Sequence, residues 1–359
     1  MRKFMAFTAA CTMAAALLAG CGGAAESTGA GQASTEAAVE AGAQETAAQE
    51  QTEAAASGTE NAAAEGESYL IGICQLVQHD ALDAATQGFK DAMVELLGED
   101  RVVFDEQNAS GDSAACATIV NQFVSSEVDL ILANATASLQ AASAATNTIP
   151  ILGTSITDYA TALNAENWTG SSGTNISGTS DLAPLEEQAA MLNELFPDAR
   201  TVGLLYCSAE PNSIYQADTI QAALEEMGYT CETYTFADSN DIASVVTNAA
   251  GACDVIYVPT DNTAASNVEI IDNICQPAGV PVIAGEEGAC RGCGVAALSI
   301  NYYDIGYKAG EMAVDILENG ADITTMPIQS APNVTRKYVA SRCEALGIAV
   351  PEGYEAIAE

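Results

Sequence analysis

The residues best suited to binding chemistry follow directly after an apolar run. The stretch "VIYVPTDN" passes from four apolar or aromatic residues through a proline into Thr260, Asp261 and Asn262. A turn needs one or two polar residues, so three together indicate that something is held at this point. An aspartate here can also cap a following helix, and that alternative stays open. We interpret the three residues as a ligand clamp that also starts a helix.

Groups that could perform catalysis or hold a metal ion are few. His79 is the single histidine, and the sequence contains no G-x-S-x-G elbow and no phosphate-binding P-loop, so acid–base chemistry would fall to carboxylates alone. The stretch "CRGC" at 290–293 could be a redox pair or half of a metal site, but no second pair accompanies it. We therefore predict no enzymatic activity, no cofactor and no metal.

Strands that alternate with amphipathic helices would position these residues. Two units begin alike: an apolar strand at 69–75 leads to a helical stripe ending at Gly98, and one at 201–207 leads to a stripe ending at Gly228. Later segments match in the same way: residues 128–138 with 253–263, and 148–155 with 279–286. The predicted fold is α/β, with two similar doubly wound parallel-sheet lobes joined by a hinge.

Ligands of parallel α/β sheets bind beyond the carboxyl ends of the strands. Polar residues follow the strands in both halves of this sequence, so two facing edges would form a cleft. The stretch "WTGSSGTNISGTSD" at 168–181 falls between the halves and is rich in Gly and Ser, which is typical of a hinge crossing.

The first 67 residues are expected to lie outside the folded lobes. Residues 1–20 form a secretory signal, and "LAGC" at its end resembles the bacterial lipoprotein signal, in which Cys21 carries the lipid. An ordinary cleavable signal is the alternative. Residues 21–67 form an acidic Ala- and Glu-rich stretch that we interpret as a disordered tether.

Composition limits the partners and the compartment. The formal net charge is −39, which excludes nucleic acid as a partner. Nine cysteines remain after the signal and Cys21, an odd number, and several lie in apolar strands, as small hydrophobic residues do. This usage fits an exported protein of an anaerobe. We expect the outer face of the cytoplasmic membrane of a Gram-positive cell, with membrane contact through the lipid.

The chain from about Tyr69 to its end resembles the substrate-binding proteins of ABC transporters, in the tryptophan- and tyrosine-type uptake family. The motifs that carry the resemblance are "QHDALD" at 78–83, "NISGTSD" at 175–181, "SAEPNS" at 208–213, "VPTDN" at 258–262 and "INYYDIGYKAG" at 300–310. The first motif departs from the family pattern, which has an acidic residue and a proline where Gln78 and Asp80 stand here.

The resemblance implies a type I periplasmic-binding-protein fold, with an N-terminal lobe at 68–176, a C-terminal lobe at 177–300 and a segment at 301–359 that crosses back between them. It implies capture of a small molecule, first of all an amino acid, aromatic amino acids included, with an ABC permease and ATPase as partners. A sensory module that binds the same ligand for a receptor, and an enzyme acting in the same cleft, are the alternatives.

The cleft residues suit an amino acid. Hydroxyls and N–H groups at helix starts can bind its carboxylate, and carboxylates can pair with its ammonium. Asp181 could instead be a helix cap, and His79 could be solvated. The candidate ligand-binding residues are Gln75, His79, Thr136, Ser155, Thr157, Asp158, Asp181, Glu210, Asn212, Ser213, Thr260, Asp261, Asn262, Glu286 and Tyr303.

Overall fold

The computed structural model describes residues 68–331 and 333–358. The predicted signal, Cys21 and the tether that runs to residue 67 lie outside the described residues. Within the described part of the chain, no helix combines the length and the apolar character needed to cross a bilayer.

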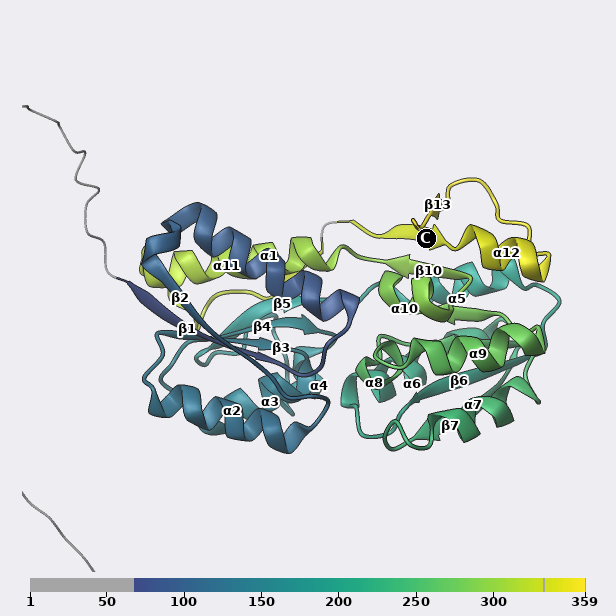
Figure 1. The fold of residues 1–359 in the computed structure, drawn as a ribbon, viewed down its shortest axis with the longest axis horizontal. Coiled ribbons are helices and arrows are strands. Elements are labelled where there is room, and N and C mark those ends of the chain that lie inside the picture. The colour runs from purple at the N-terminus through teal and green to yellow at the C-terminus, as the bar shows by residue number, and fades with distance from the viewer. Residues whose placement is uncertain (1–67, 332, 359) are drawn as a thin grey trace, which may run out of the picture. The chain divides into compact units, whose positions relative to one another are not determined.

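The first lobe is built on a six-stranded parallel sheet (Figure 1). Its central strands are rich in Ile, Leu and Ala and are buried throughout, as is typical of a parallel sheet with helices on both faces. In spatial order the strands are β11 (Gln329–Ser330), β5 (Ile176–Ser180), β4 (Ile151–Ile156), β3 (Leu130–Asn134), β1 (Tyr69–Gln75) and β2 (Val102–Asn108). The order changes direction between β1 and β3, where a ligand site is expected beyond the strand ends.

The second lobe repeats this arrangement in a seven-stranded sheet. Its strands in spatial order are β13 (Glu355–Ala356), β12 (Thr335–Tyr338), β10 (Ala296–Ser299), β9 (Val282–Ala284), β8 (Val255–Val258), β6 (Thr201–Cys207) and β7 (Thr230–Phe236). All neighbours are parallel except β10 and β12. The series β7-β6-β8-β9-β10 has the order of β2-β1-β3-β4-β5, so the predicted pair of similar doubly wound lobes is confirmed.

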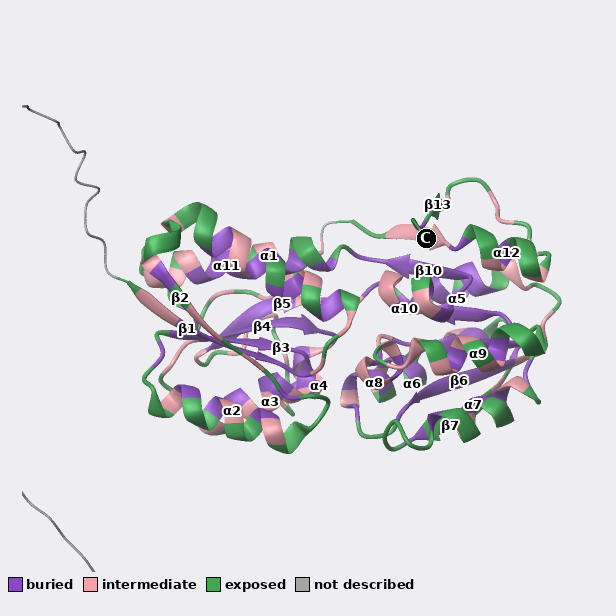
Figure 2. Cartoon of the chain, viewed as in Figure 1, coloured by how far each residue is buried: buried purple, intermediate pink, exposed green. Residues whose placement is uncertain are grey.

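Helices cover both faces of the first sheet. One face carries α1 (Asp80–Leu97) and α11 (Tyr302–Leu317), and the other carries α2 (Ser113–Ser125), α3 (Thr136–Ala145) and α4 (Tyr159–Ala162). A short 3-10 turn, Glu99–Arg101, follows α1. The central strands are buried, while the helices turn exposed faces outward (Figure 2).

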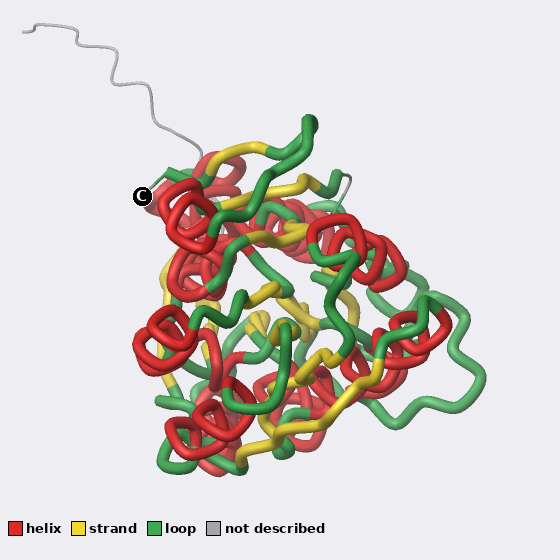
Figure 3. Tube along the Cα trace, turned by 90° about the vertical axis from the view of Figure 1, so that its right-hand side faces the viewer, coloured by secondary structure: helices red, strands yellow, loops and turns green. Residues whose placement is uncertain are grey.

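The second sheet is covered in the same way. On one face lie α5 (Leu185–Leu195), α6 (Pro211–Glu226) and α12 (Ala340–Leu346), and on the other α7 (Ile242–Ala250) and α9 (Val268–Ala278). Two short helices, α8 (Asn262–Ala265) and α10 (Glu287–Cys293), follow strands β8 and β9. The view turned by 90° shows the inner strands with helices packed around them (Figure 3).

The crossings between the lobes differ from the predicted boundary at residues 176 and 177. Strand β5 pairs with β4, Ile176 beside Ile151, so it belongs to the first sheet. The chain therefore crosses after Ser180, at the end of the predicted stretch 168–181. It crosses again between β10 and α11 and a third time between β11 and β12, so the segment from residue 301 onward contributes to both lobes.

Candidate ligand-binding site

A small buried cavity lies between the lobes, beyond the carboxyl ends of strands from both sheets. Its volume, measured for the centres of water-sized spheres, is about 10 Å³, close to the minimum that holds one water molecule. A molecule the size of an amino acid would fit only if the walls moved apart. The lining residues are His79, Leu82, Ser155, Thr157, Asp181, Asn212, Thr260, Asp261, Asn262, Ala265, Glu286 and Tyr302.

Three polar atoms in this lining are buried and have no hydrogen-bond partner among the described residues: His79 Nδ1, Ser155 Oγ and Thr260 Oγ1. An unpaired buried polar group costs about 1–3 kcal/mol. A fourth such atom, Asn134 Oδ1, belongs to a residue that does not line the cavity. These three groups around one cavity are free to hydrogen-bond a polar molecule held between the lobes.

Ser155 is held at the cavity by strained backbone. Its φ is 56°, in the left-handed region that non-glycine residues seldom adopt. The pairing of β4 with β5 shifts register between Gly153 and Ile156, and such a bulge redirects side chains at the end of a strand. Strain of this kind collects at functional sites.

Asp181 is the cavity carboxylate whose side-chain partners are two hydroxyl groups and which caps no helix. Thr157 Oγ1 and Tyr302 OH donate hydrogen bonds to it at 3.0 and 2.9 Å. Burial raises the pKa of Asp181, and these two hydrogen bonds oppose the rise. A positively charged group beside this carboxylate would offset the cost of burying its charge.

The other two cavity carboxyls cap helices. Asp261 accepts hydrogen bonds from the N–H groups of Ala264, at the start of α8, and of Cys207, at 2.7 and 2.6 Å. Glu286 accepts from Gly288 and Ala289 at the start of α10. Burial raises the pKa of Glu286 to about 7, and burial together with Glu210 raises that of Asp261.

Behind the cavity wall, Glu210 organises the start of α8. One of its oxygens accepts from Thr263 N and Oγ1 at 2.9 and 2.7 Å. The other accepts from Asn262 N and Nδ2 at 3.0 and 2.7 Å, and from Asn212 Nδ2 at 3.3 Å. Asn262 Oδ1 in turn lies 3.2 Å from Nε2 of His79. His79 belongs to the first lobe, so this contact joins the two lobes.

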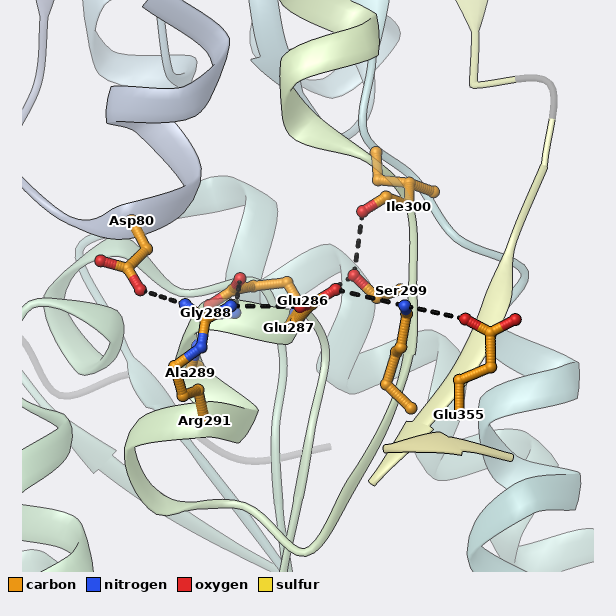
Figure 4. A network of polar contacts seen from close by, with 10 residues as sticks. Asp80, Glu286, Glu287, Gly288, Ala289, Arg291, Ser299, Ile300 and Glu355 are labelled. Carbon is orange, nitrogen blue, oxygen red and sulfur yellow. Dashed lines mark hydrogen bonds and ion pairs between the residues drawn. The ribbon is translucent and has the colours of Figure 1, made fainter. Parts of the chain in front are cut away.

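A chain of ion pairs runs beside Glu286 (Figure 4). Arg291 of α10 pairs with Asp80 at the start of α1 in the other lobe, and also with Glu287 at 3.1 Å. Lys337 lies 3.9 Å from Glu287 and 3.0 Å from Glu355. A larger polar cavity of about 720 Å³ adjoins these residues, but none of the unpaired atoms described above lines it.

Some of the predicted site residues lie away from the small cavity. Tyr303 is exposed on α11, where its hydroxyl donates to Asp91 at 3.0 Å, and it does not line the small cavity. Asp158 caps α4 through Thr161 N. The remaining residues outside the lining are Gln75, Thr136, Glu210 and Ser213, all of them buried.

The cavity wall also contains Tyr302, Leu82 and Ala265, which are not among the predicted ligand-binding residues. Tyr302 is the first residue of α11, directly after Asn301, whose side chain caps the helix by accepting from Tyr303 N and Asp304 N. The capping asparagine is a signal that could have placed the helix start, and with it the direction of Tyr302.

Comparison with known proteins gives a consistent result. The family model of the ABC transporter substrate binding protein matches residues 70–358. A protein of Clostridioides difficile named tyrosine-binding protein is 35% identical over 260 residues, which cover 72% of this chain and 75% of that protein.

Two solved structures are informative. An ABC domain from Streptococcus pneumonia in complex with L-Trp is 31% identical, with a TM-score of 0.77, over 81% of this chain and 100% of that one. A substrate-binding protein with adhesive properties from Clostridium difficile, in a ligand-free, open structure, is 36% identical, with a TM-score of 0.62, over 80% and 99%.

Proposed function

Because the chain belongs to the family of ABC transporter substrate-binding proteins, we propose that it captures an amino acid, first of all tyrosine or tryptophan, between its lobes and delivers it to an ABC permease and ATPase. Relatives that bind these two amino acids, by their names or their structures, support the choice of ligand.

The observation that carries the proposal is the set of unsatisfied groups in the cavity. Asp181 would accept hydrogen bonds from the ammonium, because its present partners are two hydroxyls, whereas Asp261 and Glu286 cap helices. The hydroxyls of Ser155 and Thr260, unpaired among the described residues, would donate to the carboxylate. One zwitterion would thus satisfy groups from both lobes, and this gain would drive the lobes to close.

The apolar part of the lining supports an aromatic side chain. Leu82 and Ala265 come from opposite lobes, and the ring of Tyr302 adds an aromatic surface between the polar groups. Binding sites for small molecules combine such apolar walls with a few convergent polar groups.

Titration calorimetry of the purified protein with the common L-amino acids tests the proposal. We expect tyrosine or tryptophan to bind, and saturation at 100 times the dissociation constant to stabilise the protein by about 2.7 kcal/mol. Tyramine lacks the carboxylate and 4-hydroxyphenylpropionate lacks the ammonium, so both should bind far more weakly than tyrosine. Absence of binding by every amino acid would overturn the proposal.

We also propose that a lipid on Cys21 anchors the protein to the outer face of the membrane, since "LAGC" at 18–21 resembles the lipoprotein signal. Replacement of Cys21 by Ser should release the protein into the soluble fraction or leave its precursor unprocessed. Fractionation with mass analysis of Cys21 is the measurement. Wild-type protein that is wholly soluble and carries no lipid would contradict the anchor.

A further inference from the structure

We propose that Glu210 and Asn262 fix His79 in a single tautomer, so that its Nδ1 accepts a hydrogen bond from an N–H or O–H group of the bound amino acid. The inference rests on the proposed function, because it concerns the same cavity. It assigns roles to three residues in series: Glu210 orients Asn262, Asn262 orients His79, and His79 contacts the ligand.

The first step is the orientation of the Asn262 amide. Its nitrogen donates to Glu210 Oε2 at 2.7 Å. An ionised carboxylate only accepts hydrogen bonds, and every contact described for Glu210 above is with an N–H or O–H donor. Glu210 therefore requires the amide nitrogen on its side, which leaves Oδ1 facing His79.

The second step follows from the chemistry of the amide oxygen. Asn262 Oδ1 lies 3.2 Å from His79 Nε2, and a carbonyl oxygen can only accept. The proton of the imidazole must then be on Nε2. In the neutral ring the other nitrogen, Nδ1, carries a lone pair and acts as an acceptor.

The third step is the charge of the ring. Burial lowers the pKa of His79, and this effect outweighs Asn262, Glu210, Asp83 and Asp80, which all raise it. The neutral ring thus predominates at neutral pH. Its Nδ1 is buried, lines the cavity, and has no partner among the described residues.

The consequence is a rule for ligand recognition. His79 Nδ1 demands a donor from the ligand, as Asp181 does, whereas the hydroxyls of Ser155 and Thr260 can donate or accept. The ammonium of the amino acid can supply that donor, and so can the phenol of tyrosine or the indole N–H of tryptophan. Binding experiments can separate the two sources.

Nitrogen-15 NMR of the protein saturated with tyrosine or tryptophan, whichever binds, tests the relay, because the bound ligand closes the lobes and His79 is the only histidine in the chain. We expect a protonated, pyrrole-type shift for Nε2 and an unprotonated, pyridine-type shift for Nδ1. The reversed tautomer, or a charged ring at neutral pH, would overturn the inference. Calorimetry first confirms that the amino acid binds, so a wrong tautomer in the saturated protein overturns this inference alone, whereas absence of binding overturns the proposed function.

Binding by His79 variants identifies the donor. The variant His79→Leu removes the acceptor and should weaken ligand binding on the order of tenfold. The matched variant His79→Asn keeps an acceptor oxygen near the position of Nδ1 and should retain more affinity. Equal losses for tyrosine and phenylalanine would assign the donor to the ammonium, and a loss for tyrosine alone would assign it to the phenol. Unchanged affinity for both, or equal losses in the Leu and Asn variants, would overturn the contact.

Discussion

Asp181 and Asp261 both line the cavity, but their partners give them different roles. Asp181 is bound by neutral hydroxyls, so we expect Asp181→Asn to weaken amino-acid binding about ten- to a hundredfold, the value of a hydrogen bond to a charged group. Both oxygens of Asp261 accept from backbone N–H groups, which favours the capping alternative over the clamp inferred from sequence.

Asp261→Asn is therefore the matched control. It should lower the melting temperature, because an amide offers one acceptor oxygen where two N–H groups need one each, and it should leave affinity nearly unchanged. Calorimetric titration and melting curves of both variants decide between the two aspartates. Full affinity in Asp181→Asn together with a loss in Asp261→Asn would return the clamp role to Asp261.

The buried carboxyls should make the closed form of the protein less stable as the pH rises. The pKa of Glu286 is about 7 in the fold, against 4.5 as its ordinary value. A raised pKa in the folded state gives a stabilising contribution that is complete below the ordinary value and is lost as the pH rises through the folded value. The pKa of Asp181 and of Asp261 shifts in the same direction.

We therefore expect the melting temperature to fall between about pH 5 and about pH 8. Glu286→Gln mimics the protonated side chain and should flatten part of this fall. The variant also separates Glu286 from the general self-repulsion of a chain with a net charge of −39. A melting temperature that rises over this range, or an unchanged slope in the variant, would contradict the role of Glu286.

The sequence predicted which types of residue line the site better than it predicted the directions of their side chains. The polar residues after β4 and β8 do line the cavity, because carboxyl ends of parallel strands meet at one edge. Neighbouring residues on a helix point about 100° from each other, so only one of Tyr302 and Tyr303 can face the cavity. The amino-acid types of the two residues are the same and do not tell which one does. Only the helix start at Asn301 decides that Tyr302 faces the cavity and Tyr303 the solvent.

At the scale of elements, strand β5 shows why a boundary could be misplaced. Its sequence, "ISGTS", is small and polar, which is typical of a loop. Gly178 explains the composition: its φ is 141°, and a Cβ there would lie 2.0 Å from the carbonyl oxygen of Gly153. The close approach of β5 to β4 requires glycine at position 178. The local sequence does not show which strand pairs with β5, so the strand resembles a loop.

Helices α1 and α11 pack closely enough to require glycine. A Cβ on Gly306 would lie 1.9 Å from the carbonyl oxygen of Ala85, and backbone cannot give way as a flexible side chain can. We expect Gly306→Ala to cost about 1–3 kcal/mol or more of unfolding free energy. Affinity should fall too, because the two helices start beside His79 and at Tyr302.

Gly251→Ala is the matched control for this contact. Gly251 is also in ordinary helix-end geometry, with its nearest neighbouring atom 3.4 Å from an added Cβ, so the change should stay within about 0.5 kcal/mol. Chemical denaturation of both variants is the measurement. Equal stability in the two variants would show that α1 and α11 can separate without cost.

At the scale of the whole folded unit, the arrangement of the lobes resembles the ligand-bound state. The chain shares slightly more sequence with the open, ligand-free relative, yet its TM-score is higher with the L-Trp complex. The cavity agrees with this, because groups of both lobes surround it and leave too little room for an amino acid to pass. Entry of the ligand therefore requires opening at the three crossings between the lobes.

We expect this opening to appear in solution as a change in size. Small-angle scattering should give a larger radius of gyration for the free protein than for the protein saturated with its amino acid. The reason is that the cavity wall is shared: without ligand, the unpaired buried groups favour separation and hydration of the lobes. Identical curves for both states, with binding confirmed by calorimetry, would refute a clamshell motion.

The ion pair between Asp80 and Arg291 should bias this equilibrium slightly toward the closed form. It joins the two lobes, but its side chains are 66% and 40% exposed, so its contribution should be about 0–1 kcal/mol and should weaken with salt. Arg291→Gln should thus lower the affinity for the amino acid by no more than about fivefold and reduce the salt dependence of that affinity.

Arg336→Gln is the matched control. It removes a comparably exposed ion pair with Glu194 inside the second lobe, and it should change neither the affinity nor its salt dependence. Of these two arginines, only Arg291 pairs with a residue of the other lobe. Equal changes of affinity in the two variants would therefore show that loss of a positive charge, and not loss of the contact between the lobes, changes the affinity.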